Sequence, residues 1–519
     1  MPGVSRFLTG SSVLVAGVVG VTVAALLLTD TAGPSMESRR TPRVDPRPVT
    51  LSAVSERPFG TDAWRLTKPA TNRQIEGYPT VASGVAGVRV GLKVSTIART
   101  FRVHAFRLGW YEGGTGRLVW RSRVSRGRQQ ASAAFAPYST RTIVAPWRRI
   151  LSVDTRGWRP GAYVFKLTTG SRWQAHVPYF VRSRSSRGKV ALVAPVTTWQ
   201  AYNDWGGYSL YVGPSTDRRS WAVSFDRPYP PPGAGQMMYG VVPVVVWAER
   251  LGLPLAYFTN LDLSRRTRLL SGARGYVSMG HDEYWTLSMR NSVLEARRSG
   301  TNLAFLGANT MYWRIRLEDR ETGRRRVVVG YRSDAHLDPM RGVQPARTTA
   351  RFRDPPARKP ENSLIGMLYE CFPVDAPYRV VSPRWWGFEG TRVRRGQEFA
   401  HLVGIEADRV YPVASTPRPM RILSHVSYSC GGVSTSAQSV YYTTKSGAGV
   451  FAAGTLRWTC ALTGRCGDYT LQARTIRFTR RVTSNLLRQF AAGPVGRRHP
   501  AHDNVDAFDL PKVNQVPAS

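Results

Sequence analysis

The sequence has 519 residues, of which 42% are hydrophobic, so it can bury a large core, and disorder is not expected away from its ends. Its 73 basic residues outnumber 33 acidic ones and give a formal charge of +40. The basic residues are scattered, without any helix-turn-helix, zinc-finger or RNA-binding motif, so we expect no nucleic-acid partner. Adhesion to an acidic envelope or membrane surface remains an alternative.

An apolar segment lies near the N-terminus. Residues 11–28 carry no charge and follow Arg6, and a segment of this length can just span a bilayer. The small residues at 31–33 fit a cleaved export signal equally well. Residues 1–30 are therefore predicted to be a signal or transmembrane anchor. On either interpretation the protein is membrane-anchored or secreted, with its bulk outside the cytoplasm.

The next segments predict a tether and then strands. Residues 31–73 are rich in Pro, Ser, Thr and Arg, which is typical of a flexible tether. From 74 to 183, short alternating segments such as 88–94 and 101–108 are separated by turn residues. Strands at this spacing without helical patterns predict an immunoglobulin-like β-sandwich.

Strands and helices alternate from residue 188 onward. Apolar runs such as 190–196 predict buried strands, and 241–252 predicts a helix. This alternation predicts an α/β domain over 188–492, with a mainly parallel sheet covered on both faces. The complete fold is thus expected to be mixed. Residues 315–400 are rich in charge and Pro and are interpreted as an insertion, and 493–519 as a loose tail.

Polar residues follow two neighbouring strands of the predicted sheet. His281 and Glu283 come after an apolar run at 275–279, and Asn309 comes after another at 302–307. Ligands bind beyond the carboxyl ends of strands in open parallel sheets, so we expect these side chains at one rim. Alternatively they cap the intervening helix, although caps favour a single Ser, Thr or Asp.

All four cysteines lie in the last third of the chain. Cys460 and Cys466 bracket a loop of five residues, and no close CxxC or His pair favours zinc. We expect two disulfides, Cys460–Cys466 and Cys371–Cys430, as in an exported protein.

Several catalytic motifs are absent. The sequence contains no HExxH, GxSxG or Walker motif, and no PCxxC accompanies the zinc-deaminase-like spacing of His281 and Glu283. What remains is a cluster of hard oxygen donors with one imidazole. Carboxylate and phenolate favour a hard, Lewis-acidic ion such as ferric iron.

Six short motifs recur in the order found in a known family. They include Gly-His-Asp-Glu-Tyr-Trp at 280–285 and Gly-Ala-Asn-Thr-Met-Tyr-Trp-Arg at 307–314. Over about 74–490 the chain resembles the catalytic subunit of N,N-dimethylformamidase and its wider family. The other motifs lie at 107–111, 208–211, 223–229 and 404–409.

The resemblance implies hydrolysis of a small amide by a mononuclear iron (Fe³⁺) site of two tyrosines and one glutamate. Carried over by position, Glu283 is the carboxylate ligand and Tyr202 is one tyrosine ligand. Tyr163 is the second, reaching in from the sandwich, unless it is only a packed strand tyrosine.

The resemblance also implies roles for three further residues. His281 and Asn309 would orient water or substrate, and Glu406 would be the general base, unless it only pairs with Arg409. A separate small subunit or a homo-oligomer is expected as partner. The export segment, the cysteines and the Arg-rich insertion depart from the family pattern. A non-catalytic envelope protein that binds acidic glycans or lipids is therefore the alternative function.

Overall fold

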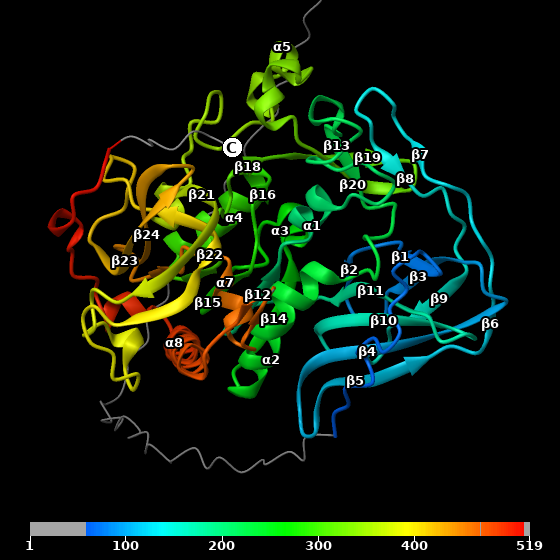
Figure 1. Ribbon diagram of the computed structural model, residues 1–519, viewed down its shortest axis with the longest axis horizontal. Coiled ribbons are helices and arrows are strands. Elements are labelled where there is room, and N and C mark those ends of the chain that lie inside the picture. Colours follow the sequence, from blue (N-terminus) through cyan, green and yellow to red (C-terminus); the bar gives the residue numbers. More distant parts are fainter. Residues whose placement is uncertain (1–58, 468, 513–519) are drawn as a thin grey trace, which may run out of the picture. The chain divides into compact units, whose positions relative to one another are not determined.

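The computed structural model describes residues 59–467 and 469–512, and Figure 1 shows their arrangement. The predicted anchor at 1–30 lies outside the described residues. Within them, no helix combines the length and the apolar character needed to cross a membrane. The described residues all belong to one compact unit.

Two sheets of the N-terminal region pack around a shared core. One has the order β1-β3-β9, and the other has the order β2-β11-β10-β4-β5 with β6 beside β4. Val90 and Leu92 of the first sheet and Phe165 and Val177 of the second belong to the same buried cluster. An immunoglobulin-like arrangement stays a prediction. The strands are β1 (Ile75–Pro79), β2 (Ser83–Gly84), β3 (Arg89–Thr96), β4 (Thr100–Tyr111), β5 (Gly114–Arg121), β6 (Ser125–Arg126), β7 (Ala134–Phe135), β8 (Ile143–Val144), β9 (Leu151–Asp154), β10 (Gly161–Thr169) and β11 (Gln174–Val181).

A seven-stranded sheet with the order β14-β12-β15-β17-β25-β24-β23 forms the centre of the remaining chain. Its first five strands are mutually parallel, and β24 runs antiparallel to both of its neighbours, β25 and β23. The elements that build its first half are β12 (Val190–Ala194), α1 (Val196–Tyr202), η1 (Thr216–Arg218), β13 (Ala222–Ser224), η2 (Met237–Val241), α2 (Val242–Arg250), β14 (Leu255–Thr259), α3 (Asn260–Arg265), β15 (Gly275–Met279), β16 (Tyr284–Trp285), α4 (Leu287–Arg298) and β17 (Asn302–Leu306).

Alternate residues of the central strands point to opposite faces of this sheet, as the period of two in a strand requires. In β12, Leu192 packs into the core that includes Val245 of α2 and Phe478 of α8. The next residue, Val193, packs into the core that includes Met289 of α4. The continuous apolar runs seen in the sequence arise because both faces are buried.

Regular structure fills the segment that the sequence suggested as an insertion. β13, β20 and β19 form a three-stranded sheet, β16 pairs with β18, and β21 pairs with β22. Short helices project beside them, with α5 at the top of Figure 1. The elements are β18 (Trp313–Arg314), β19 (Arg316–Arg320), β20 (Gly323–Val329), η3 (Arg332–Leu337), α5 (Met340–Val343), η4 (Pro345–Arg347), α6 (Asn362–Ile365), β21 (Leu368–Arg379), η5 (Trp386–Phe388) and β22 (Glu398–Arg409).

Two disulfides fasten the C-terminal third. Cys371 of β21 is bonded to Cys430 at the end of β23, and Cys460 of α7 is bonded to Cys466 of β26. Both predicted pairings are confirmed. The elements here are β23 (Met420–Cys430), β24 (Val433–Thr443), β25 (Gly449–Ala452), α7 (Arg457–Ala461), β26 (Arg465–Cys466), β27 (Tyr469–Thr470), α8 (Ala473–Ala491), η6 (Val495–Arg497) and η7 (Val505–Ala507).

The mixed α/β class is confirmed, and parts of the predicted tether and of the predicted tail are packed within the described residues. In the predicted tether, Trp64 is buried and its carbonyl accepts a hydrogen bond from His176 Nε2 (2.7 Å). In the predicted loose tail, Val495 and Val505 are buried. Hydrogen bonds of the backbone and of side chains also hold both segments, and hydrophobic periodicity does not reveal such contacts. The predicted domain borders stay predictions.

Candidate active site

Two glycines bring the ends of parallel strands β15 and β17 together. Gly280 has φ of +77°, and a Cβ on Gly307 would lie 2.3 Å from the carbonyl oxygen of Gly280. Only glycine permits this backbone conformation and this close approach without strain. His281 and Glu283 follow the first strand and Asn309 follows the second, so they lie at one rim of the sheet.

Glu283 receives hydrogen bonds from two phenols. The Tyr202 hydroxyl donates to Glu283 Oε2 (2.7 Å). The Tyr211 hydroxyl lies 2.8 Å from Oε1 and 3.0 Å from Oε2 and itself accepts from the Tyr284 hydroxyl (2.7 Å). Glu283 is only 2% exposed, whereas the two phenols beside it are partly exposed. Three oxygen atoms of these side chains thus meet at the rim of the sheet.

A buried arginine holds the loop between Tyr202 and Tyr211. Arg227 Nη1 donates to the carbonyl oxygens of Trp205 (3.0 Å) and Tyr208 (2.7 Å), and Nη2 donates to that of Asn203 (2.5 Å). Arg227 forms no ion pair with any described residue. The guanidinium therefore holds the backbone of this loop by hydrogen bonds. The loop in turn places the hydroxyl of Tyr211 beside Glu283.

His281 lies between two carboxylates. Its Nε2 is 3.4 Å from Glu283 Oε2 and 3.3 Å from Glu406 Oε2, without hydrogen-bond geometry to either. Burial alone would lower the pKa of His281, but Glu406 and then Glu283 outweigh it and raise that pKa to about 9. Burial raises the pKa of Glu283 to about 7 against the opposing charge of His281. The two carboxylates thus favour the protonated form of the imidazole.

Asn309 is placed by its backbone. It has φ of +53°, in the left-handed region that Asn tolerates, and its N–H donates to Asp408 Oδ1 (2.8 Å). Among the described residues no group contacts Asn309 Oδ1 or Glu406 Oε2 by a hydrogen bond, although both atoms are buried. Unpartnered buried oxygens at a rim point to a ligand, since such atoms are costly to leave unpaired.

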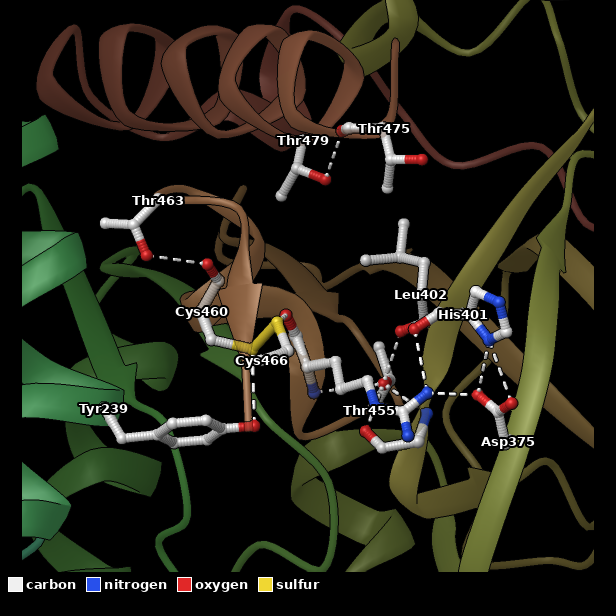
Figure 2. The surroundings of a disulfide bond; sticks show 12 residues. Tyr239, Asp375, His401, Leu402, Thr455, Cys460, Thr463, Cys466, Thr475 and Thr479 are labelled. Atoms are coloured by element: carbon white, nitrogen blue, oxygen red, sulfur yellow. Dashed lines mark hydrogen bonds and ion pairs between the residues drawn. A yellow bond between two sulfur atoms is a disulfide. The ribbon is translucent and has the colours of Figure 1, made fainter. Parts of the chain in front are cut away.

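Glu406 is held by the loop that follows β25. Thr455 accepts a hydrogen bond from the N–H of Gly404 (2.9 Å) and donates to the carbonyl of Leu402 (2.8 Å). Figure 2 shows Thr455 and Leu402 beside the Cys460–Cys466 disulfide of α7. The loop after β25 thus fixes the part of β22 that carries Glu406.

Helix capping and loop bracing, the alternative roles considered for these polar residues, are carried out by neighbours of His281 and Glu283. Thr286 caps α4 by accepting from the N–H of Met289 (3.1 Å). Asp282 accepts from the Ser278 hydroxyl (2.8 Å) and from Asn260 (3.2 Å) and braces the loop. His281 and Glu283 remain free of such structural roles.

Tyr163 does not lie beside Glu283, so the predicted set of two tyrosines and one glutamate needs a correction. Its hydroxyl donates to the carbonyl of Arg159 (2.6 Å), and its ring stacks on Trp158 (4.9 Å) within the core of the N-terminal sheets. The second tyrosine beside Glu283 is Tyr211. Tyr163 belongs to a strand whose alternate residues fill that core, so its ring cannot also reach the rim.

A comparison with known protein families assigns this chain to one of them. Residues 102–470 match the family described as N,N-dimethylformamidase beta subunit-like, C-terminal, which is more than half of the chain. The chain belongs to this family. The resemblance predicted from the short motifs is thereby confirmed.

The other comparisons add little to the family assignment. A search of curated proteins gave no match. Among solved structures, 11 chains match. One is a cycloisomaltooligosaccharide glucanotransferase from a Paenibacillus species, complexed with cycloisomaltoheptaose. It shares 10% identity over 25% of this chain and 17% of its own, with a TM-score of 0.15, and a likeness this small carries no argument.

The rim of this N,N-dimethylformamidase-like chain suits one hard cation. Two phenol oxygens and a carboxylate of Tyr202, Tyr211 and Glu283 meet within 3.0 Å, and the phenol protons are the groups that a cation would replace. In the described ranges no group of three His, Cys, Asp or Glu could hold a metal ion. A metal at this rim would therefore depend on the phenols.

Sequence reasoning missed four residues around the site. Tyr211 lies inside the motif at 208–211 and Tyr284 directly follows Glu283, so both carried a signal that could have been used. Arg227 lies inside the motif at 223–229, to which the sequence assigned no role. Arg332 gave no signal, because it lies in the segment interpreted as an insertion.

Proposed function

We propose that this chain is an exported or membrane-anchored hydrolase that cleaves the C–N bond of small amides with a single ferric ion. The family supports the reaction class, and the apolar segment at 11–28 together with two disulfides supports the location. The observation that carries the proposal is the convergence of Tyr202, Tyr211 and Glu283 at one rim.

Tyr202, Tyr211 and Glu283 would hold the iron. Bound there, a ferric ion would supply Lewis acidity toward the amide carbonyl and the attacking water. The two phenols and the carboxylate would carry three negative charges to match it. Their contacts already set the three oxygens close together, so binding requires loss of protons and little movement.

Three residues around the ligands would manage protons and charge. Glu406 Oε2 is buried and without a hydrogen-bond partner among the described residues, so it can accept a proton from the attacking water. It then returns that proton to the nitrogen of the leaving amine. His281, held as a cation, and the side-chain amide of Asn309 would stabilise the negative charge that develops on the carbonyl oxygen.

Two structural proposals accompany this function. The N-terminal sheets would form an immunoglobulin-like sandwich, which their antiparallel pairing around one core supports. The family description refers to a beta subunit, which supports assembly with a separate small subunit or with further copies of the chain.

The substrate would be a small neutral amide.

The net charge of +40 favours a second candidate function. A non-catalytic envelope protein could use this charge to bind acidic glycans or lipids. Such binding is electrostatic and would weaken steeply as salt is raised. It would require neither iron nor the phenol pair.

Iron content and amide hydrolysis separate these candidates. We expect stoichiometric iron and hydrolysis of small neutral amides in the wild type and in the control Glu295→Ala, which changes an exposed residue of α4. Glu283→Ala is expected to lose both iron and activity. Asn309→Ala is expected to keep iron and lose roughly two to three decades of rate. A metal-free wild type that binds acidic vesicles and hydrolyses no amide would overturn the hydrolase.

A further inference from the structure

Arg332 is a buried cation without a carboxylate partner. It begins η3 inside the segment at 315–400, is 8% exposed and has φ of +60°. Within the described ranges it forms no ion pair, and its Nε has no hydrogen-bond partner. A buried charge is costly to leave unpaired, so its surroundings should show what compensates it.

The compensation comes from the phenol beside Glu283. The guanidinium carbon lies 4.0 Å from the ring centroid of Tyr211, within the range of a cation–π contact. Its Nη1 lies 3.4 Å from the Tyr284 hydroxyl, which donates to the Tyr211 hydroxyl (2.7 Å). Arg332 therefore meets Tyr211 both at the ring face and, through Tyr284, at the phenol oxygen.

The contact is one end of a continuous stack. Tyr211 and Tyr202 stack with ring centroids 4.4 Å apart at an interplanar angle of 22°. The ring of His281 also contacts Tyr202, in a tilted arrangement with centroids 5.2 Å apart at 50°. The order is Arg332, Tyr211, Tyr202, His281, so a guanidinium and an imidazole flank the two phenols that meet Glu283.

We propose that Arg332 is a positioning residue that fixes the Tyr211 ring and stabilises negative charge on its oxygen, thereby setting how strongly that oxygen donates electrons to a bound ferric ion. This rests on the proposed function. A cation beside a phenolate stabilises the charge in the ground state more than after an electron has moved toward the metal. The segment at 315–400 thus contributes directly to the site.

The absorption of the ferric protein tests this role. Charge transfer from phenolate to ferric iron gives a visible band, and loss of the cation should move its maximum to longer wavelength. Arg332→Met and Arg332→Gln remove the charge, whereas Arg332→Lys retains it. Arg141→Gln is the matched control, because Arg141 stacks on Trp221 (4.4 Å) and does not contact the phenols.

We expect a longer-wavelength maximum in Arg332→Met and Arg332→Gln at equal iron content, and an unmoved maximum in Arg332→Lys and Arg141→Gln. Folded, iron-loaded Arg332→Met or Arg332→Gln with the wild-type maximum would overturn this inference alone. If one of the two uncharged variants fails to fold, the other decides, because both remove the charge. A wild type that takes up no iron and has no colour overturns the proposed function as well.

Discussion

Tyr211 and Tyr163 offer a matched comparison at the scale of single residues. The Tyr211 hydroxyl contacts Glu283, whereas the Tyr163 hydroxyl donates to the carbonyl of Arg159. Tyr211→Phe is expected to lose bound iron because one of three oxygen donors is removed. Tyr163→Phe is expected to keep iron and to lose about 1 kcal/mol of unfolding free energy. Elemental analysis and denaturant unfolding measure the two quantities.

The opposite result would restore the ligand set suggested by the family resemblance. Loss of iron in Tyr163→Phe, with normal iron in Tyr211→Phe, would mean that the ring of Tyr163 leaves its core when metal binds. Its stacking on Trp158 and full burial make such a movement costly.

Most of the candidate site could be predicted from the sequence. His281, Glu283 and Asn309 follow strands that are easily recognised in the sequence by their continuous apolar residues. Glu406 came from a motif, and its place beside His281 depends on β22 lying close to the rim. Tyr163 lies in the core of the N-terminal sheets, and its position in a motif does not tell which side of a strand its ring occupies. Arg332 could not be found, since its partner Tyr211 lies far from it in the sequence.

At the scale of elements, Arg227 offers a test of how the loop at 203–210 is held. Three backbone carbonyls accept from it, and burial lowers its pKa to about 9. Arg227→Met is expected to cost about 3 kcal/mol or more of unfolding free energy, because those carbonyls lose their donor. Arg218→Met, at an exposed position, is the control. Equal denaturant midpoints for the two variants would show that the loop keeps its conformation without Arg227.

Asp408 on β22 predicts a dependence of stability on pH. Burial raises its pKa from 3.8 to about 7, although the N–H of Asn309 opposes the rise. Between these values the folded protein binds the proton more tightly than the unfolded chain. Its contribution to stability is therefore complete below about pH 4 and is lost as pH rises to about 7.

Replacing Asp408 isolates that contribution. The unfolding free energy of Asp408→Asn should not show this decline, so the wild type should lose stability relative to the variant as pH rises from about 4 to about 7. Asp509→Asn, at an exposed position, should follow the wild type throughout. Parallel wild-type and Asp408→Asn curves from pH 4 to 7 would contradict the raised pKa.

Elements with clean periodicity could be predicted closely, as α8 shows. The sequence predicts a helix over 475–490, and the structure has one at Ala473–Ala491. β21 and β22 could not be predicted, because their pairing shifts register at three places and β21 contains Pro373 and Pro377. Repeated bulges destroy the alternation by which a strand is recognised.

At the scale of the whole molecule, the two disulfides should differ in how much they stabilise the fold. Cys371 and Cys430 are separated by 59 residues, and Cys460 and Cys466 by 6. Chain-entropy estimates give about 4 kcal/mol for the long loop and about 2 kcal/mol for the short one. Replacing each pair by serine and measuring unfolding tests this order. Four reactive thiols in the native protein would contradict both disulfides and the proposed export.

The order of strands in the central sheet has a consequence for synthesis on the ribosome. β17 ends at Leu306, but its neighbour β25 begins only at Gly449. Until those later residues emerge, a nascent chain holds the four strands β14, β12, β15 and β17, and β17 is an open edge that the complete sheet does not have. Such an edge, built from wholly buried residues, is a template for pairing with another chain. Chains released from the ribosome before β25 is made should therefore aggregate. Chains that are still being synthesised should need protection of the β17 edge until β25 has emerged.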